Sequence, residues 1–235
     1  MRVIKLFEGR YYEEKYGTLL LKGEKPFYHR FWMRYLRKYK ESGRLLDLGC
    51  GLGFFLRYAE KYYETYGIDL SHFGIKEAKK RCNTEMVVGS ATYIPFKDNY
   101  FDVITCFDLL EHMENPKDAI AECYRLLKDD GLLVITTPNI SSNGLKWKKE
   151  KWFGFRDETH ISLLSNDEWI NMLKKNSFKI VDVFYDGLWD TPYFEVVPRV
   201  FQDLMIKYPS IVLFGFGLKF PRSLGENLCI VACKR

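Results

Sequence analysis

The chain has 235 residues, of which 47% are hydrophobic and 29% charged, with a formal net charge of +5. This length is enough for one domain whose core needs neither disulfides nor a metal, and the composition excludes a disordered or fibrous chain. The apolar runs are too short to cross a bilayer and residues 1–8 are interrupted by charge, so we expect no membrane span, no signal peptide and a cytoplasmic location.

The six cysteines, at positions 50, 82, 106, 123, 229 and 233, include no C-x-x-C pair. Most of them fall in segments with the pattern of buried strands or helices. We therefore expect reduced, structural thiols and no bound metal.

Along the chain, apolar segments typical of strands alternate with amphipathic segments typical of helices. Asn115-Pro116 is typical of a helix start, and Ser165 with Glu168 predicts a capping box. Alternation of this kind predicts a parallel sheet with helices on both faces. The expected strands are 44–48, 65–69, 85–89, 101–106, 131–136, 178–185 and 227–233, and the expected helices are 26–40, 54–62, 73–81, 117–128 and 166–175.

Residues 47–53 read Asp-Leu-Gly-Cys-Gly-Leu-Gly and directly follow the first expected strand. Only glycine turns sharply from strand to helix and also exposes bare backbone to a ligand, so Gly49, Gly51 and Gly53 predict a cofactor loop. The dinucleotide fingerprint G-x-G-x-x-G requires a glycine at position 54, where the chain has Phe54. A nicotinamide cofactor therefore fits poorly.

Two acidic residues indicate a different cofactor. Asp47 precedes the loop, and a carboxylate there suits a ligand that carries positive charge. S-adenosylmethionine has an ammonium and a sulfonium group and no phosphate. Asp69 lies 22 positions after Asp47, at the end of the second expected strand. An acid at that place can accept hydrogen bonds from both ribose hydroxyls.

With these motifs the chain resembles the class I S-adenosylmethionine-dependent methyltransferases, in the type 11/type 23 group. The likeness is strongest over residues 43–137 and is carried further by segments 88–96, 101–112, 131–138 and 157–180. The resemblance implies an α/β fold. The expected fold is a Rossmann-like, doubly wound, mostly parallel seven-stranded sheet with helices on both faces, which makes a three-layer α/β/α sandwich.

The resemblance also implies which residues bind the cofactor. Where the family usually has an acid for the adenine amino group, this chain has Ser90, whose hydroxyl can still accept a hydrogen bond. The expected cofactor-binding residues are Asp47, Gly49, Cys50, Gly51, Gly53, Asp69, Leu70, Ser90, Ala91 and Phe107.

We interpret residues 1–235 as a single methyltransferase domain. Residues 1–42 form an N-terminal helical cap, 43–185 the cofactor-binding core, and 186–226 an insertion between the last two strands. Its stretch 188–224 is long and rich in apolar residues. Such connections are commonly lids, here over an amphiphilic acceptor, but extra core or a homodimer interface fits as well.

Two aromatic-rich segments have alternative interpretations. In the N-terminal piece, rings from Tyr11, Tyr12 and Tyr16 to Trp32 either hold the sulfonium by a cation–π contact or pack the helix onto the sheet. Segment 146–152 interleaves lysines with two tryptophans. It either grips a phosphate or is a solvated loop.

Methyl transfer is an in-line displacement, so positioning carries most of the rate and a base helps only when the acceptor is protonated. The chain has four histidines, His29, His72, His112 and His160. His112 resembles the family position beside cofactor and acceptor. We expect His112 to line the pocket and His160, oriented by Asp157, to act as base.

The expected function is transfer of a methyl group from S-adenosylmethionine to an O, N or C atom of a small-molecule or amphiphilic acceptor. A noncatalytic S-adenosylmethionine-binding module and an RNA or protein methyltransferase remain alternatives. The Asn/Asp-Pro-Pro-Tyr/Phe signature of base-modifying enzymes is replaced by Asp108-Leu109-Leu110-Glu111. We therefore do not expect nucleic acid as the partner, and a charge of +5 is a weak argument for it.

Overall fold

A seven-stranded sheet forms the centre of the computed structural model, which describes residues 26–235. The strand order is β3-β2-β1-β4-β5-β7-β6, and β7 runs antiparallel to both of its neighbours. The other neighbouring strands pair in parallel. The strands are β1 Arg44–Leu48, β2 Glu64–Asp69, β3 Glu85–Val88, β4 Phe101–Phe107, β5 Leu127–Pro138, β6 Phe178–Tyr185 and β7 Asn227–Lys234.

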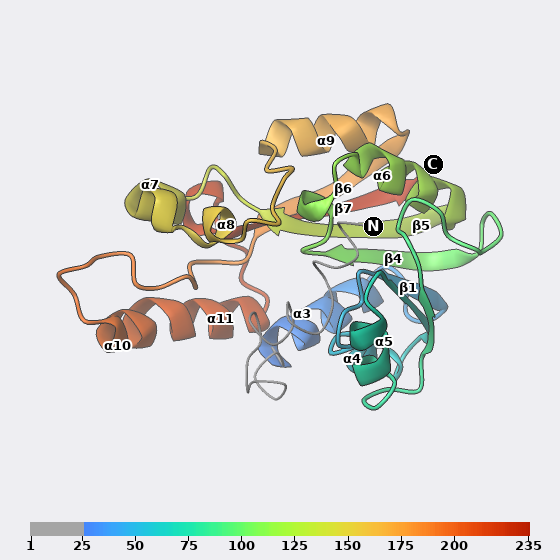
Figure 1. Cartoon of the computed structure of the whole chain (residues 1–235), viewed down its shortest axis with the longest axis horizontal. Coiled ribbons are helices and arrows are strands. Elements are labelled where there is room, and N and C mark those ends of the chain that lie inside the picture. Colours follow the sequence, from blue (N-terminus) through green and yellow to red (C-terminus); the bar gives the residue numbers. More distant parts are fainter. Residues whose placement is uncertain (1–25) are drawn as a thin grey trace.

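Helices cover both faces of this sheet, with α6 and α9 on one side and α3, α4 and α5 on the other (Figure 1). The predicted three-layer, Rossmann-like α/β/α arrangement is thereby confirmed. The helices are α3 Pro26–Arg37, α4 Leu56–Ala59, α5 His72–Ala78, α6 Pro116–Leu126, α7 Asn143–Lys148, α8 Phe153–Arg156, α9 Asn166–Lys175, α10 Arg199–Gln202 and α11 Tyr208–Gly215, with short 3₁₀ or π turns η1 Leu110–His112, η2 Lys149–Lys151, η3 Asp203–Lys207 and η4 Arg222–Leu224.

Most expected elements occur within two residues of their predicted ends, and the capping box of Ser165 and Glu168 begins α9 as predicted. Four predictions were wrong in extent: the helices expected over 26–40 and 73–81 each end three residues early, at Arg37 and Ala78, and the other two differ further. The helix expected over 54–62 contains only the four residues of α4, because tighter bonds to the third preceding residue, such as Tyr62 N–H to the Ala59 carbonyl, close its end. Strand β5 extends beyond 131–136 because Leu127 pairs with Phe101 and Pro138 with Asn227.

The core consists of two apolar layers, one on each face of the sheet. On one face, α6 buries an apolar stripe along one side of the helix, which consists of Ala119, Ile120, Cys123 and Leu126. On the other face, α3 buries Phe31, Trp32 and Leu36. The expected structural role of the cysteines agrees with this core, because all six lie in the described range as free thiols and only Cys233 is partly exposed.

The insertion, residues 186–226, packs back onto α3 through α11. The Phe214 ring lies 4.0 Å from the Phe31 ring, centroid to centroid. The chain at Gly215 approaches Phe27 so closely that a Cβ there would be 2.7 Å from the Phe27 Cβ. Part of the insertion is therefore core. Tyr11, Tyr12 and Tyr16 of the expected cap lie outside the described residues, and within 26–235 no helix is both long and apolar enough to span a membrane.

The register of β1 and β4 determines the surroundings of Asp47. Thr105 pairs with Asp47 across the two strands, and its hydroxyl donates a hydrogen bond of 2.6 Å to Asp47 Oδ1. Only 3% of Asp47 is exposed. Burial is the largest influence on this carboxyl and raises its pKa from 3.8 to about 7, a rise that the Thr105 bond opposes and the charge of Asp69 reinforces.

Burial of Asp47 predicts a loss of stability across neutral pH. Because the pKa of Asp47 is about 7 in the folded chain and near 3.8 unfolded, the folded state binds more protons between these values and loses stability as pH rises. From pH 6 to pH 8 the loss from this group is about 1.4 kcal/mol. Denaturant unfolding of the ligand-free protein and of Asp47→Asn at both pH values tests this. Two parallel pH profiles would contradict it, since the variant lacks the titrating group.

Candidate functional site

The expected cofactor residues lie at the carboxyl ends of β1, β2, β3 and β4. The strand order reverses between β1 and β4. Ligands of open α/β sheets bind at this switch point. The glycine loop, residues 49–53, follows β1 there. Gly49 has φ 71° and Gly53 has φ 74°, and a Cβ at either would stand 2.8 Å from a neighbouring side chain, Leu109 or Ala78. Both positions therefore require glycine, because the loop is strained for any L side chain and tightly packed.

Asp69 ties the glycine loop to the next element of the chain. Its Oδ2 accepts a hydrogen bond of 2.8 Å from Gly51 N–H, and its Oδ1 accepts one of 2.8 Å from Ser71 N–H. Ser71 is also the N-cap of α5, accepting from Gly74 N–H. Asp69, 9% exposed, thus fixes the backbone of the loop and of the segment after β2.

The remaining expected residues are placed around this edge. The Cys50 thiol faces into the sheet, since a Cβ on Gly67 would come within 2.9 Å of its sulfur, so only the backbone of Cys50 can serve a ligand. Leu70 follows Asp69 and is half-buried. Ser90 and Ala91 follow β3 beside Asp69, whose carbonyl accepts from Gly89 N–H at 3.0 Å, and the Ser90 hydroxyl pairs with Thr92 at 2.8 Å.

Phe107, the last residue of β4, belongs to a group of packed rings. Its centroid lies 4.8 Å from that of Phe55, 5.2 Å from Trp32 and 5.9 Å from Tyr28. Trp32 is fully buried. In the described part of the N-terminal piece, these aromatic side chains pack α3 onto the sheet, in agreement with the second of the two interpretations given above.

His112 and His160, the histidine pair, come together from segments 48 residues apart, with ring centroids 4.7 Å apart. His112 ends the η1 turn and His160 precedes α9. The two segments are joined because the Glu111 carbonyl accepts from Ile161 N–H and Ser162 N–H, each at 2.9 Å. The other two histidines lie elsewhere. His29, in α3, packs on the ring of Tyr58 in α4, and His72 is exposed at the start of α5.

Hydrogen bonds orient both rings of the pair. His160 Nδ1 is 2.8 Å from the Gly154 carbonyl, and His112 Nδ1 is 3.2 Å from the Thr159 carbonyl and 2.8 Å from its hydroxyl. The Thr159 hydroxyl donates to Asp157. Asp157 Oδ2 also lies 3.7 Å from His160 Nε2, so the expected neighbour of His160 is present.

The histidine pair and the glycine loop share a wall of the site. Leu109, three residues before His112, packs directly against Gly49. Sequence reasoning assigned no role to Thr105, Leu109 or Thr159. A parallel register of β1 and β4 would have indicated Thr105, but the contacts of the other two depend on loop packing, for which the sequence has no periodic signal.

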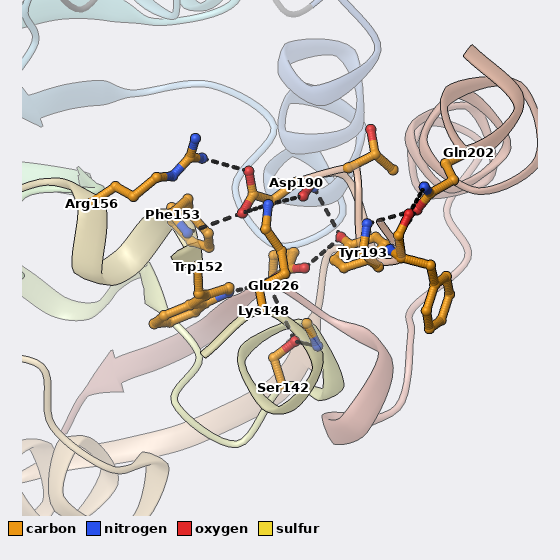
Figure 2. Close-up of polar contacts among 12 residues, drawn as sticks. Ser142, Lys148, Trp152, Phe153, Arg156, Asp190, Tyr193, Gln202 and Glu226 are labelled. Carbon is orange, nitrogen blue, oxygen red and sulfur yellow. Dashed lines mark hydrogen bonds and ion pairs between the residues drawn. The ribbon is translucent and has the colours of Figure 1, made fainter. Parts of the chain in front are cut away.

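A second polar group, the Glu226 network, fastens the insertion to α7 and α8 (Figure 2). The buried Glu226 carboxylate accepts from Trp152 Nε1 at 2.6 Å, Tyr193 OH at 2.5 Å and Ser142 Oγ at 3.3 Å. Burial is the largest cause of its raised pKa, although these three bonds oppose it. The network therefore fixes the segments that follow β5 and β6 as one unit.

Beside this network, Asp190 of the insertion forms ion pairs with Lys148 and Arg156 (Figure 2). Lys148 Nζ and Arg156 Nη2 reach its carboxylate at 2.6 and 2.7 Å, and the side chain of Lys148 is 7% exposed. Trp152 is fully buried. Segment 146–152 is thus the end of α7 and the η2 turn, in which Lys148 and Trp152 are structural and the other residues are exposed. Gln202 adds bonds from Tyr193 N–H at 2.7 Å and to the Val197 carbonyl at 2.6 Å.

The geometry at β1 and β2 fits S-adenosylmethionine. Gly49 and Gly53 have positive φ angles that favour glycine, and the carboxylate of Asp69 lies at the end of β2, hydrogen-bonded to this loop. Asp47, in β1, is buried, and its pKa of about 7 leaves it partly ionised at pH 7. These residues offer a cradle with acidic groups and no basic side chain among them, as a positively charged ligand requires.

Comparisons with known proteins agree with this fit. A family model described as "Methyltransferase domain" matches residues 21–183. An uncharacterised protein of Methanocaldococcus jannaschii is 28% identical over 229 residues, covering 85% of this chain and 89% of that one. A ubiquinone/menaquinone biosynthesis C-methyltransferase of a Ruegeria species is 32% identical over 133 residues, covering 50% of this chain and 53% of that one.

Among solved structures, an S-adenosylmethionine-dependent methyltransferase from Archaeoglobus fulgidus is similar with a TM-score of 0.67 and 21% identity, covering 95% of this chain and 98% of that one. This likeness shows the fold. The family match over more than half of the chain shows the family. The chain therefore belongs to the methyltransferase domain family, in the type 11/type 23 group of class I S-adenosylmethionine-dependent methyltransferases.

Proposed function

We propose that this methyltransferase moves a methyl group to an O, N or C atom of a small-molecule or amphiphilic acceptor bound beside the histidine pair. One observation carries the proposal: Leu109 joins the glycine loop to the turn that bears His112. A cofactor on the loop and an acceptor at the histidines would therefore be neighbours. In-line transfer needs only that the two reacting atoms be held close and aligned.

S-adenosylmethionine supplies the methyl group, already activated by the sulfonium, when it is bound. In this proposal Asp69 and the loop backbone hold the ribose and the amino-acid end, and Ser90 and Ala91 lie where the adenine is expected. Phe107 and its packed rings exclude water from the reacting end. Desolvation of this kind favours the transfer of positive charge away from sulfur.

We propose His160 as the residue that takes a proton from an acceptor hydroxyl or amine. Its ring is held by the Gly154 carbonyl on the Nδ1 side, and its side chain is 5% exposed. His112 then lines the same side of the pocket. A neutral imidazole is an effective base near neutral pH.

The amphiphilic part of the proposal is supported by the outer face of the insertion. Val200, Phe201, Leu204, Met205 and Phe216 are each more than 60% exposed, which is unusual for so many large apolar side chains close together in sequence. A curated relative acts in ubiquinone and menaquinone biosynthesis, according to its name. An exposed apolar face on the insertion suits a molecule with an apolar tail.

The proposed cofactor site can be tested by ligand binding. Calorimetric titration with S-adenosylhomocysteine should show one site, and Asp69→Ala should weaken binding by about 10- to 150-fold, because hydrogen bonds to charged groups contribute about 1.5–3 kcal/mol. Asp129→Ala, at an exposed position of β5, is the matched control and should bind normally. NADH should not bind. A folded, ligand-free chain that fails to bind S-adenosylhomocysteine would refute the proposed cofactor site.

The proposed role of the insertion can be tested by lipid binding. Phe201→Ser combined with Met205→Ser should reduce binding of a fluorescent single-chain lipid at least severalfold, because both exposed side chains would lose their contact with the apolar tail. Affinity for S-adenosylhomocysteine should not change. Val181→Ser, at an exposed apolar residue of β6 that is not part of the insertion, serves as control. Equal lipid binding by all three proteins would contradict the amphiphilic acceptor and leave the cofactor site untouched.

A further inference from the structure

We propose that Glu111, His112 and His160 form a binding site for a divalent transition-metal ion. One donor atom from each of these side chains lies within 4.8 Å of the other two. They come from two segments that the Glu111 carbonyl holds together. The proposal replaces the sequence-based expectation of a metal-free site, which rested on the cysteine spacing alone.

The chemistry of the three donors suits such an ion. Two imidazoles and one carboxylate are the protein ligands of several catalytic zinc sites and of the facial triad that binds iron(II). Both kinds of site leave coordination positions open. Hard ions such as Mg²⁺ and Ca²⁺ prefer oxygen ligands alone, so the donor set favours Zn²⁺ and similar ions.

The hydrogen bonds behind the rings prepare them as ligands. A carbonyl oxygen can only accept a hydrogen bond, so the contacts to Gly154 and Thr159 place the proton of each ring on Nδ1. The lone pair of the neutral ring is then on Nε2. Histidines that bind metals nearly always donate their other N–H to a carbonyl or carboxylate, which fixes the tautomer and the ring orientation.

Asp157 and Thr159 complete this outer layer on the His112 side. The Thr159 hydroxyl accepts from His112 Nδ1 at 2.8 Å and donates to the Asp157 carboxylate. The carboxylate therefore acts on the ring through the hydroxyl and increases its basicity. This relay is a positioning device. It explains why segment 157–160 carries an acid and a hydroxyl residue directly before His160.

Burial further suits the three residues to this role. Glu111 is fully buried, and the side chain of His160 is 5% exposed. Ligand atoms around an ion with bonds of about 2.1 Å lie roughly 3–3.5 Å apart. The donor atoms lie within 4.8 Å of one another, so the side chains need to move together by no more than about 1.5 Å when the ion binds.

Such an ion would change the role proposed for His160. A nitrogen that binds a metal cannot also take a proton, so the ion, rather than His160, would promote loss of a proton from an acceptor heteroatom by lowering its pKa. The proton leaves to solvent, the new bond forms to the methyl carbon, and the carbon–sulfur bond breaks toward sulfur. This acceptor role rests on the proposed function, whereas metal binding itself does not.

Titration of the untagged, chelator-treated protein with Zn²⁺ alone tests the site, together with visible absorption after addition of Co²⁺. We expect one ion per chain and no sulfur-to-cobalt charge-transfer band. Glu111→Gln and His160→Gln should each weaken Zn²⁺ binding at least tenfold. Thr159→Ala should also weaken Zn²⁺ binding, but by less than either ligand variant, because it removes an outer-layer hydrogen bond and no ligand atom, and the Thr159 carbonyl remains.

His72→Gln, at an exposed histidine outside the site, is the matched control and should bind Zn²⁺ like the original chain. Equal affinity in a folded Glu111→Gln/His160→Gln double variant would overturn the proposal, as would a thiolate spectrum with Co²⁺. Titration of the metal-free samples with S-adenosylhomocysteine separates the two proposals. Cofactor binding by a chain that takes up no ion overturns the metal site only, and the reverse result overturns only the cofactor site.

Discussion

The carboxylate of Asp69 is the contact on which the rest of the site depends. With one oxygen it fixes Gly51 in the glycine loop, and with the other it fixes Ser71, which begins α5. Hydrogen bonds to an ionised group are among the stronger ones in proteins. Two loops that follow different strands are therefore held in one geometry, and the bare backbone at the switch point is prepared before any ligand arrives.

Different kinds of residues follow the strands on the two sides of this contact. On the β1 and β2 side lie glycines and acids, with no basic side chain among the residues of the cradle. On the β4 side, the turn after Phe107 brings Glu111 and His112 to segment 157–160. The two sides meet where Leu109 lies against Gly49. In the function proposed above, the first side holds the methyl donor and the second receives the acceptor.

The segments that follow β5 and β6 depend on a different kind of contact. The Glu226 network buries a carboxylate among hydroxyl and indole donors, and Asp190 gathers Lys148 and Arg156 nearby. A buried polar group is favourable only when its hydrogen bonds are made, so these segments keep one arrangement or lose it together. The insertion combines this fixed base with an exposed apolar face on α10 and η3. The hydrogen bonds of Glu226 thus hold the insertion in place while its apolar side chains on α10 and η3 stay exposed.

Periodicity and spacing determined the fold and the cofactor region of this chain. The alternation of apolar segments predicted the sheet and its helices, and the motif Asp-x-Gly-x-Gly-x-Gly predicted the loop, because each depends on neighbours within a few residues in sequence. The length of α4 and the start of β5 were missed, since hydrogen bonds to distant strands and tight turns decided them. Only the tertiary structure brought His112 to His160 and placed Thr159 behind the ring of His112. It also turned Lys148 and Trp152 inward while their neighbours face solvent. Contacts between segments tens of residues apart leave no local pattern, and they form only when the whole chain packs.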